Sequence, residues 1–534
     1  MPDSNKQIIT PNETTQIEGK KPTRTREKIR SIRLKNTLFL RNTKKSILLT
    51  LLIFSIFVST EGLARTIYYG AILINPDGPS LTNSRIIVNQ GRITCVSNIN
   101  GCAKIDGDIE VDLSDRWITP GFIDTHVHLN FGKDALDHQR RRLAYGITTV
   151  RDAATLQLDR LLAHRKQAVA DAPLPSIVVS ALIHPSNSDQ PGNNEPGSIA
   201  LNLKNLGVDF IKLKNEGPTE RLLKIIRAGK KAGLPVYGHT WYGPPPQSIL
   251  ENAINSGLDG VAHLMGIAPG YQTAEIQSIP DAVEDSTNFW KWRKNLWLTT
   301  DPDGLDRLID LMVRNNVWLE PTLTFEFYWD SGVRPAYCGF LDTERSLSLR
   351  ESLTWGWPTS TAPTFPKPYA VMTAFVKRFA DKGGMIVAGT DNKCPGPDMH
   401  EEIRLLRNAG LTPHQALRAA TSNAAKVLGL AHDRGTIATG QRADFIVFEQ
   451  NPLVDLNAKI ETVVLRGFEH DPQNLLKPES EIFESKRQQL WINGFAKWSR
   501  YPFIALLLLG ISLRHWEERK RRFPNHFRIE NKRR

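Results

Sequence analysis

The sequence contains little cysteine. Its 534 residues include four, Cys95, Cys102, Cys338 and Cys394, which are too few for a scaffold held together by disulfides. No Cys-x-x-Cys pair occurs, so we do not expect a zinc site made of cysteine thiolates. Cys95 and Cys102 flank a short hairpin-like turn, Val-Ser-Asn-Ile-Asn-Gly, and could pair in an oxidising compartment.

The sequence also lacks an apolar run of the roughly 20 residues that a spanning helix comfortably needs. Two shorter runs occupy residues 46–59 and 501–513. Lys44 and Lys45 precede the first run, and Trp498 and Trp516 flank the second, a pattern that favours membrane contact over a buried core helix. We therefore interpret residues 46–64 as an uncleaved anchor or a signal segment, and residues 498–516 as a second membrane segment.

The basic residues are concentrated at the two ends of the chain. The net charge is +12; residues 1–45 carry +8 (12 basic, 4 acidic) and residues 514–534 carry +6 (9 basic, 3 acidic), which leaves −2 for the rest. A nearly neutral body excludes a nucleic-acid-binding role. Residues 1–45 are predicted to be a disordered basic tail, and residues 517–534 form a second basic tail.

The middle of the chain alternates between strand and helix patterns, which predicts parallel β-structure built from βα units. Short strand patterns at 65–115 and 433–467 flank it and are expected to pair into one small β-sandwich, while 468–497 is a polar connector. Eight strand candidates within 116–432 predict a TIM barrel of the α/β class. They are Ile118–Ile123, Thr148–Arg151, Ser176–Ser180, Phe210–Leu213, Pro235–Gly238, Gly260–Ala262, Trp318–Pro321 and Met385–Ala388.

The first of these strands leads into a His-x-His pair, His126 and His128. Alternate residues of a strand point the same way, so both imidazoles face one side and form half of a transition-metal site. The preceding Pro-Gly-Phe-Ile-Asp-Thr completes a segment that resembles the first barrel strand of the amidohydrolase superfamily. The resemblance extends from about residue 67 to residue 467.

The resemblance implies four further metal ligands, each at the end of a predicted barrel strand. They are Lys212, His239, His263 and Asp391. A lysine in a buried strand needs a special explanation because an unpaired ammonium group there is costly. In binuclear members of this superfamily it reacts with carbon dioxide, and the carbamate bridges two metals. Lys214 lies on the same face, but Lys212 occupies the position of the family motif.

The expected chemistry also follows from the resemblance. His126, His128 and Asp391 would hold one divalent metal, and His239 and His263 the other, with zinc favoured over Mn, Co or Fe. A hydroxide bridging the metals would attack the carbonyl, and Asp391 would carry its proton to the leaving nitrogen. His184, after the third strand, is a candidate for stabilising the oxyanion, and Tyr242 for binding a substrate carboxylate.

These features predict a binuclear amidohydrolase resembling the imidazolonepropionase and prolidase branch. Its small-molecule substrate would be a dipeptide, an N-acyl amino acid or a cyclic amide. A deaminase is the nearest enzymatic alternative, although it normally lacks the lysine on the fourth strand. A phosphotriester hydrolase would use the same metal centre. A barrel kept as an interaction module would be expected to have lost ligands, and none is lost. The sequence leaves open whether the chain forms a homo-oligomer.

The charge patterns at the two ends of the chain predict the same membrane topology. Basic clusters prefer the cytoplasmic side, so two crossings would leave both tails there and hold the catalytic body outside the cytoplasm, on the periplasmic side and in contact with membrane lipid. We expect a periplasm-active reporter joined near residue 470 to be active and one joined after Arg534 to be silent. Two silent fusions would place the body in the cytoplasm, and two active ones would show that residues 498–516 do not cross.

Overall fold

The computed structural model of the chain describes residues 65–129, 135–155, 157–166, 172–184, 195–214, 219–239, 249–264, 266–272, 292–331, 367–391, 395–455 and 457–477. Both tails and both terminal apolar runs lie outside these ranges, so their disorder and membrane contact stay predictions. Within the described ranges, no helix combines the length and the apolar character needed to cross a membrane.

Seven parallel strands form the central sheet, and they follow one another in space in the same order as in the chain. Their interior positions are mostly buried on both faces, as expected for a parallel sheet covered by helices. The strands are β7 (Phe122–Val127), β8 (Ile147–Thr155), β9 (Ser176–Ile183), β10 (Phe210–Lys214), β11 (Val236–His239), β12 (Gly260–Ala262) and β13 (Trp318–Glu320).

An extended segment takes the place of the predicted eighth strand, Met385–Ala388. It makes one parallel bridge to β13, between Leu319 and Ile386. On its other side the Thr125 amide of β7 donates to the Ala388 carbonyl (3.0 Å). Because this segment contacts both the last and the first strand, it closes the ring. The predicted TIM-like barrel is therefore confirmed, with an eighth position that is too short to form a regular strand.

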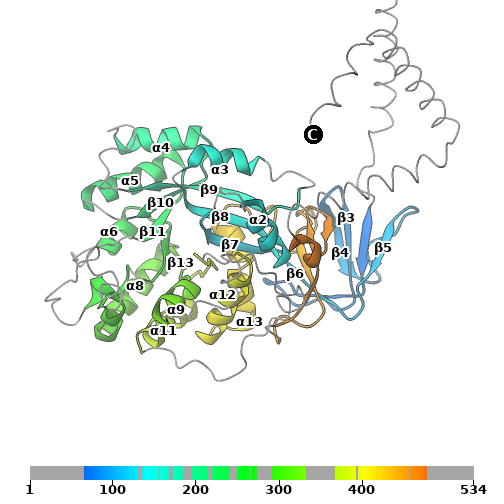
Figure 1. Cartoon of the computed structure of the whole chain (residues 1–534). Helices are drawn as coiled ribbons and strands as arrows, with labels where there is room; N and C mark the ends of the chain where they lie inside the picture. The colour runs from blue at the N-terminus through cyan, green and yellow to red at the C-terminus, as the bar shows by residue number, and fades with distance from the viewer. Residues whose placement is uncertain are drawn as a thin grey trace, which may run out of the picture. The chain divides into compact units, whose positions relative to one another are not determined.

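Helices surround the barrel strands (Figure 1). Local sequence explains where two of these helices begin. At the start of α8, the Asp301 side chain accepts a hydrogen bond from the Asp303 amide, and Pro302 follows as the first helical residue. At the start of α13, Thr412 and Gln415 form a capping box. The helices are α2 (Ala135–Ala144), α3 (Leu158–Arg165), α4 (Pro196–Asn205), α5 (Thr219–Ala232), α6 (Ile249–Asn255), α8 (Pro302–Arg314), α9 (Leu323–Ser331), α11 (Lys367–Asp381), α12 (Pro397–Asn408), α13 (Pro413–Ala419) and α14 (Ser422–Val427).

The segments before and after the barrel build two further sheets, as the sequence predicted. A four-stranded sheet has the order β4-β3-β1-β5, and a five-stranded sheet has the order β16-β15-β14-β6-β2. The strands are β1 (Thr66–Tyr69), β2 (Ile72–Leu73), β3 (Ser84–Asn89), β4 (Arg92–Asn98), β5 (Ile109–Asp112), β6 (Trp117–Pro120), β14 (Phe445–Phe448), β15 (Ile460–Leu465) and β16 (Phe468–His470).

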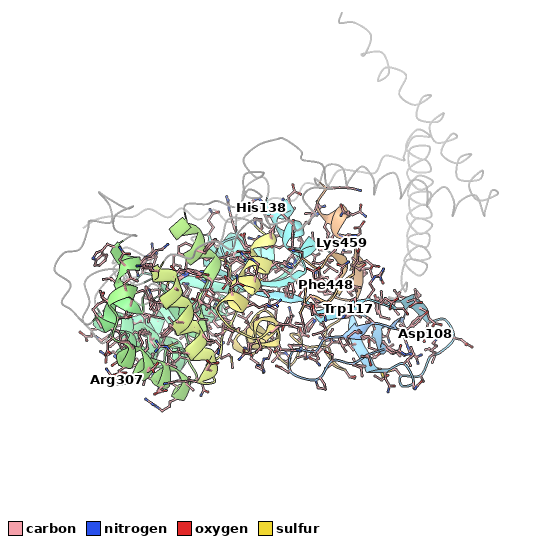
Figure 2. The ribbon with its side chains drawn as sticks, turned by 90° about the horizontal axis from the view of Figure 1, so that it is seen from below. Asp108, Trp117, His138, Arg307, Phe448 and Lys459 are labelled. Carbon is pink, nitrogen blue, oxygen red and sulfur yellow. A yellow bond between two sulfur atoms is a disulfide. The ribbon has the colours of Figure 1, made fainter. Side chains whose placement is uncertain are left out.

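The two sheets share one apolar core and so form the predicted sandwich. Tyr68 of one sheet packs edge-on against Phe445 of the other, with ring centroids 5.1 Å apart. Trp117 and Phe448, labelled in Figure 2, are paired across β6 and β14. In β4, Cys95 is joined to Cys102 by a disulfide, the pairing considered from the sequence. Cys338 and Cys394 lie outside the described residues.

Two predicted boundaries were wrong. The strand candidate Ile118–Ile123 is two strands: β6 belongs to the sandwich, and β7 starts the barrel after Gly121. Gly121 donates its amide to the Asp444 carbonyl (2.9 Å), and a Cβ atom at this position would lie 2.4 Å from Thr148 Oγ1. The connector predicted at 468–497 also begins too early, because β16 and the short helix α15 (Pro472–Leu475) occupy its first residues.

Candidate metal centre

Six predicted ligands lie at the carboxyl-terminal edge of the barrel, where TIM barrels place their active sites. His126 is the fifth residue of β7 and His128 follows that strand; Lys212 lies in β10, His239 ends β11, and His263 follows β12. Asp391 follows the extended segment that closes the barrel. The parallel order of the strands brings these residues from distant parts of the chain to one edge.

Asp391 lies among the histidines. Its Oδ1 atom is 2.8 Å from His128 Nε2 and 3.6 Å from His126 Nε2, and its Oδ2 atom is 3.4 Å from His263 Nε2. The ring centroids of His239 and His263 are 5.3 Å apart. Within the described residues, His126, His263 and Asp391 offer ligand atoms that all lie within 4.8 Å of one another, a spacing that could hold a metal ion.

The protonation states suit a divalent metal. Burial and the nearby Lys212 ammonium lower the pKa of His126 to about 4, and burial lowers the pKa values of His239 and His263 well below their usual range. Burial opposes ionisation of Asp391, but the histidines around it hold its pKa below the usual range. The neutral imidazoles of His126, His239 and His263 beside an ionised carboxylate are a donor set that zinc accepts. Burial alone would lower the pKa of His128, but its hydrogen bond to Asp391 raises it.

Lys212 reaches this cluster from the buried interior of the barrel. It is 2% exposed, and its Nζ atom lies 3.4 Å from His126 Nε2. Burial is the main cause that lowers its pKa to about 7, so the uncharged amine is accessible near neutral pH. Lys214, the alternative on the same face, is only partly buried at the end of β10.

Backbone geometry at the cluster is unusual. His263, Thr322 and Asp391 all have left-handed backbone angles, with φ values of 62°, 47° and 47°. Such angles are rare away from glycine and concentrate at functional sites. Asp124 supports one of these turns: its carboxylate accepts from the Thr390 amide (3.0 Å) and hydroxyl (2.8 Å), directly before Asp391.

Two charged residues that support the cluster were not predicted from the sequence to belong to the site. Glu320 ends β13 and accepts from Arg151 Nη2 (2.6 Å), while its other oxygen lies 2.5 Å from His126 Nδ1. Arg151 and Glu320 are both completely buried. Burial alone would raise the pKa of Glu320, but the charge of Arg151 lowers it to about 2. The signal was present in the sequence, since each is a charged residue in a predicted barrel strand and needs a partner there.

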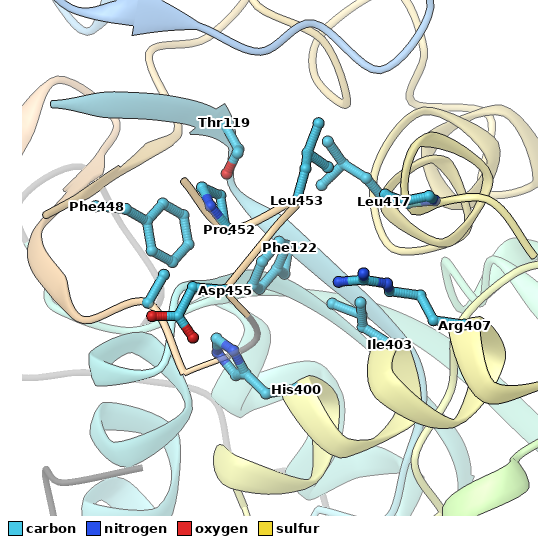
Figure 3. A pocket seen from close by; sticks show the side chains of 12 residues that line it. Thr119, Phe122, His400, Ile403, Arg407, Leu417, Phe448, Pro452, Leu453 and Asp455 are labelled. Carbon is cyan, nitrogen blue, oxygen red and sulfur yellow. The ribbon is translucent and has the colours of Figure 1, made fainter. Parts of the chain in front are cut away.

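Two further residues were predicted from the sequence to take part in catalysis or substrate binding, and the structure places only one of them. His184 directly follows β9 at the same edge of the barrel, and its role in stabilising an oxyanion stays a prediction. Tyr242 lies outside the described residues. His400 of α12 lines a separate hollow with Phe122 and Phe448 (Figure 3). Its Nε2 atom donates to the Tyr145 carbonyl (2.9 Å).

Comparison with known proteins identifies the family of the chain. The Amidohydrolase family model matches residues 117–478. An imidazolonepropionase of Chromobacterium violaceum is 25% identical over 366 residues, covering 65% of this chain and 80% of that protein. An imidazolonepropionase of Deinococcus deserti is 43% identical over 84 residues, which cover 15% of this chain and 21% of that protein.

A solved structure shares the fold. A Xaa-Pro dipeptidase crystallised with methionine in its active site superposes with a TM-score of 0.53 at 17% sequence identity, covering 76% of this chain and 100% of that one. At this identity the likeness concerns the fold alone. The family match, by contrast, spans more than half of the chain and contains all six residues predicted to be ligands. The chain therefore belongs to the amidohydrolase family and is a metal-dependent hydrolase of carbon–nitrogen bonds.

Proposed function

We propose that the chain is a binuclear amidohydrolase that cleaves the C–N bond of a dipeptide, an N-acyl amino acid or a cyclic amide. The observation that carries this proposal is the buried Lys212 amine beside the histidine and aspartate cluster. A single metal would need only the imidazoles and Asp391. A lysine whose burial favours the uncharged amine is suited to react with carbon dioxide, and the resulting carbamate would add a bridging anionic ligand.

The ligands divide between two positions. His126, His128 and Asp391 would hold one metal, His239 and His263 the other, and the Lys212 carbamate would touch both. Zinc fits this mixture of imidazole and carboxylate donors. When bound, the two cations would polarise the scissile carbonyl and make water more acidic.

Asp391 is the group of this chain that would move the proton. Its low pKa keeps it ionised before the reaction, so it can accept a proton from the attacking water. It would then deliver that proton to the leaving nitrogen, which gives a carboxylic acid and an amine. His128 Nε2 lies 2.8 Å from Asp391 Oδ1, close enough for both to serve one metal position.

The substrate class is inferred from two sources. The related imidazolonepropionases support a cyclic amide, and a dipeptide is considered because a Xaa-Pro dipeptidase shares the fold. The location outside the cytoplasm is also part of the proposal. It rests on the charge of the two tails and the apolar runs beside them, and the Cys95–Cys102 disulfide supports it because such bonds persist in oxidising compartments.

The function is tested by screening the purified full-length chain, loaded with zinc, against dipeptides, N-acyl amino acids and cyclic amides. We expect release of an amine and a carboxylic acid from one of these classes, and loss of that activity on metal chelation. Phosphotriesters and aminopurines serve as comparison substrates. Turnover of a phosphotriester or release of ammonia from a purine, with no amide cleavage, would contradict the proposal.

The metal count tests the binuclear centre. We expect about two divalent metals per chain, and Lys212→Ala should lose most of the second one because the bridging ligand is gone. Lys214→Ala is the matched control and should keep both. Elemental analysis of saturated protein decides the matter: one metal in the wild type would refute a binuclear centre, and loss of metal only in Lys214→Ala would mean that the lysine was assigned wrongly.

Asp391→Asn separates proton transfer from metal binding. The amide keeps the shape of the side chain and one oxygen donor, so part of the metal should remain. We expect turnover to fall by about 10²–10⁴-fold, the usual contribution of general acid–base catalysis. Rates within a few-fold of the wild type, measured at equal metal content, would assign the proton transfer to another group.

A further inference from the structure

One short turn contacts a histidine of each proposed metal position. Residues 320–324 link β13 to α9, and the turn enters the left-handed region at Thr322, whose φ is 47°. Glu320 lies against His126 and Thr322 against His263. The ring centroids of these two histidines are 4.7 Å apart.

At His126 the turn supplies a carboxylate. Glu320 Oε2 lies 2.5 Å from His126 Nδ1, while Oε1 already accepts from Arg151 Nη2 at 2.6 Å. An ionised carboxylate can only accept hydrogen bonds. The proton of a neutral His126 ring is therefore on Nδ1, and the lone pair on Nε2 faces Asp391.

At His263 the turn supplies a hydroxyl. Thr322 Oγ1 lies 2.7 Å from His263 Nδ1 and also donates to the Pro321 carbonyl at 2.8 Å. A hydroxyl has a single proton, so once that proton is given to the carbonyl, Thr322 can only accept from His263. His263 thus also carries its proton on Nδ1 and presents the Nε2 lone pair.

A third buried residue holds the turn in place. Glu402 of α12 is completely buried and accepts from the Leu323 amide (3.0 Å), the Thr324 amide (2.7 Å) and the Thr324 hydroxyl (2.5 Å). The backbone also ties the turn to the ligands, because the His263 amide donates to the Glu320 carbonyl (2.8 Å). The left-handed angle at Thr322 is maintained by these contacts on both sides.

We propose that the turn of residues 320–324 is a positioning element that fixes both His126 and His263 as Nε2 donors and so prepares both metal positions together. The inference rests on the proposed binuclear function, in which His126 belongs to one position and His263 to the other. Partners that fix the tautomer and orientation of a metal-binding histidine typically contribute about 10–100-fold to metal affinity. Thr322 contacts His263 through its hydroxyl and is not one of the predicted ligands, so its substitution isolates this effect.

The test compares Thr322→Val with Thr322→Ser in the full-length chain. Valine keeps the branched shape without the hydroxyl, and serine keeps the hydroxyl. In metal-free protein labelled with ¹⁵N-histidine, we expect His263 of the wild type and of Thr322→Ser to show protonated Nδ1, and Thr322→Val to lose that preference. Zinc affinity, measured by competition with a chelator, should fall about 10–100-fold at one position in Thr322→Val and stay unchanged in Thr322→Ser.

Thermal unfolding of the metal-free variants controls for a loss of fold. If Thr322→Val does not fold, Thr322→Ala removes the same hydroxyl with a smaller side chain. A hydroxyl-free variant that folds, keeps the Nδ1 proton on His263 and binds zinc as tightly as the wild type would overturn the inference. A wild type that binds no zinc would instead refute the proposed function, and the ¹⁵N spectra would still decide the tautomer.

Discussion

The ion pair between Arg151 and Glu320 is the interaction on which the rest of the site depends. Both side chains are completely buried, and removing one partner of such a pair typically destabilises a protein by about 3–5 kcal/mol. The guanidinium group also stacks over the Tyr237 ring at 3.7 Å and donates to the Thr125 carbonyl at 2.7 Å. One side chain of β8 thereby links β7, β11 and β13 across the inside of the barrel.

This arrangement explains how a buried cluster can be so rich in titratable groups. The positive charge of Arg151 keeps Glu320 ionised, and the carboxylate in turn holds His126. Asp124 makes a similar connection at the seam of the barrel, where it binds the Thr390 amide beside Asp391. His126, His263 and the turn that carries Asp391 are thus each held by a second residue on another strand or turn, so these three positions do not rely on a single strand.

The sequence predicted which residues gather at this edge of the barrel because each lies in or just after a short apolar segment, and parallel strands bring their carboxyl ends to one edge. It placed the first strand wrongly because residues 117–123 are a nearly continuous apolar run, in which Gly121 alone indicates a change of sheet. Arg151 and Glu320 were missed although the reasoning applied to Lys212 holds for them equally. No periodicity indicates a hydrogen bond between residues 194 positions apart, as for His126 and Glu320, so that contact needed the folded structure.

The chain passes from β6 to β7 through Gly121 alone, which limits how the barrel can be separated from the sandwich. A single residue separates a strand of the sandwich from the strand that carries His126 and leads into His128, and its amide donates to Asp444, which follows the barrel in the chain. The barrel therefore has no free first strand that could be excised or grafted onto another scaffold. The smallest unit that can be expressed with an intact metal centre includes both halves of the sandwich, and domain recombination would have to carry all three pieces together.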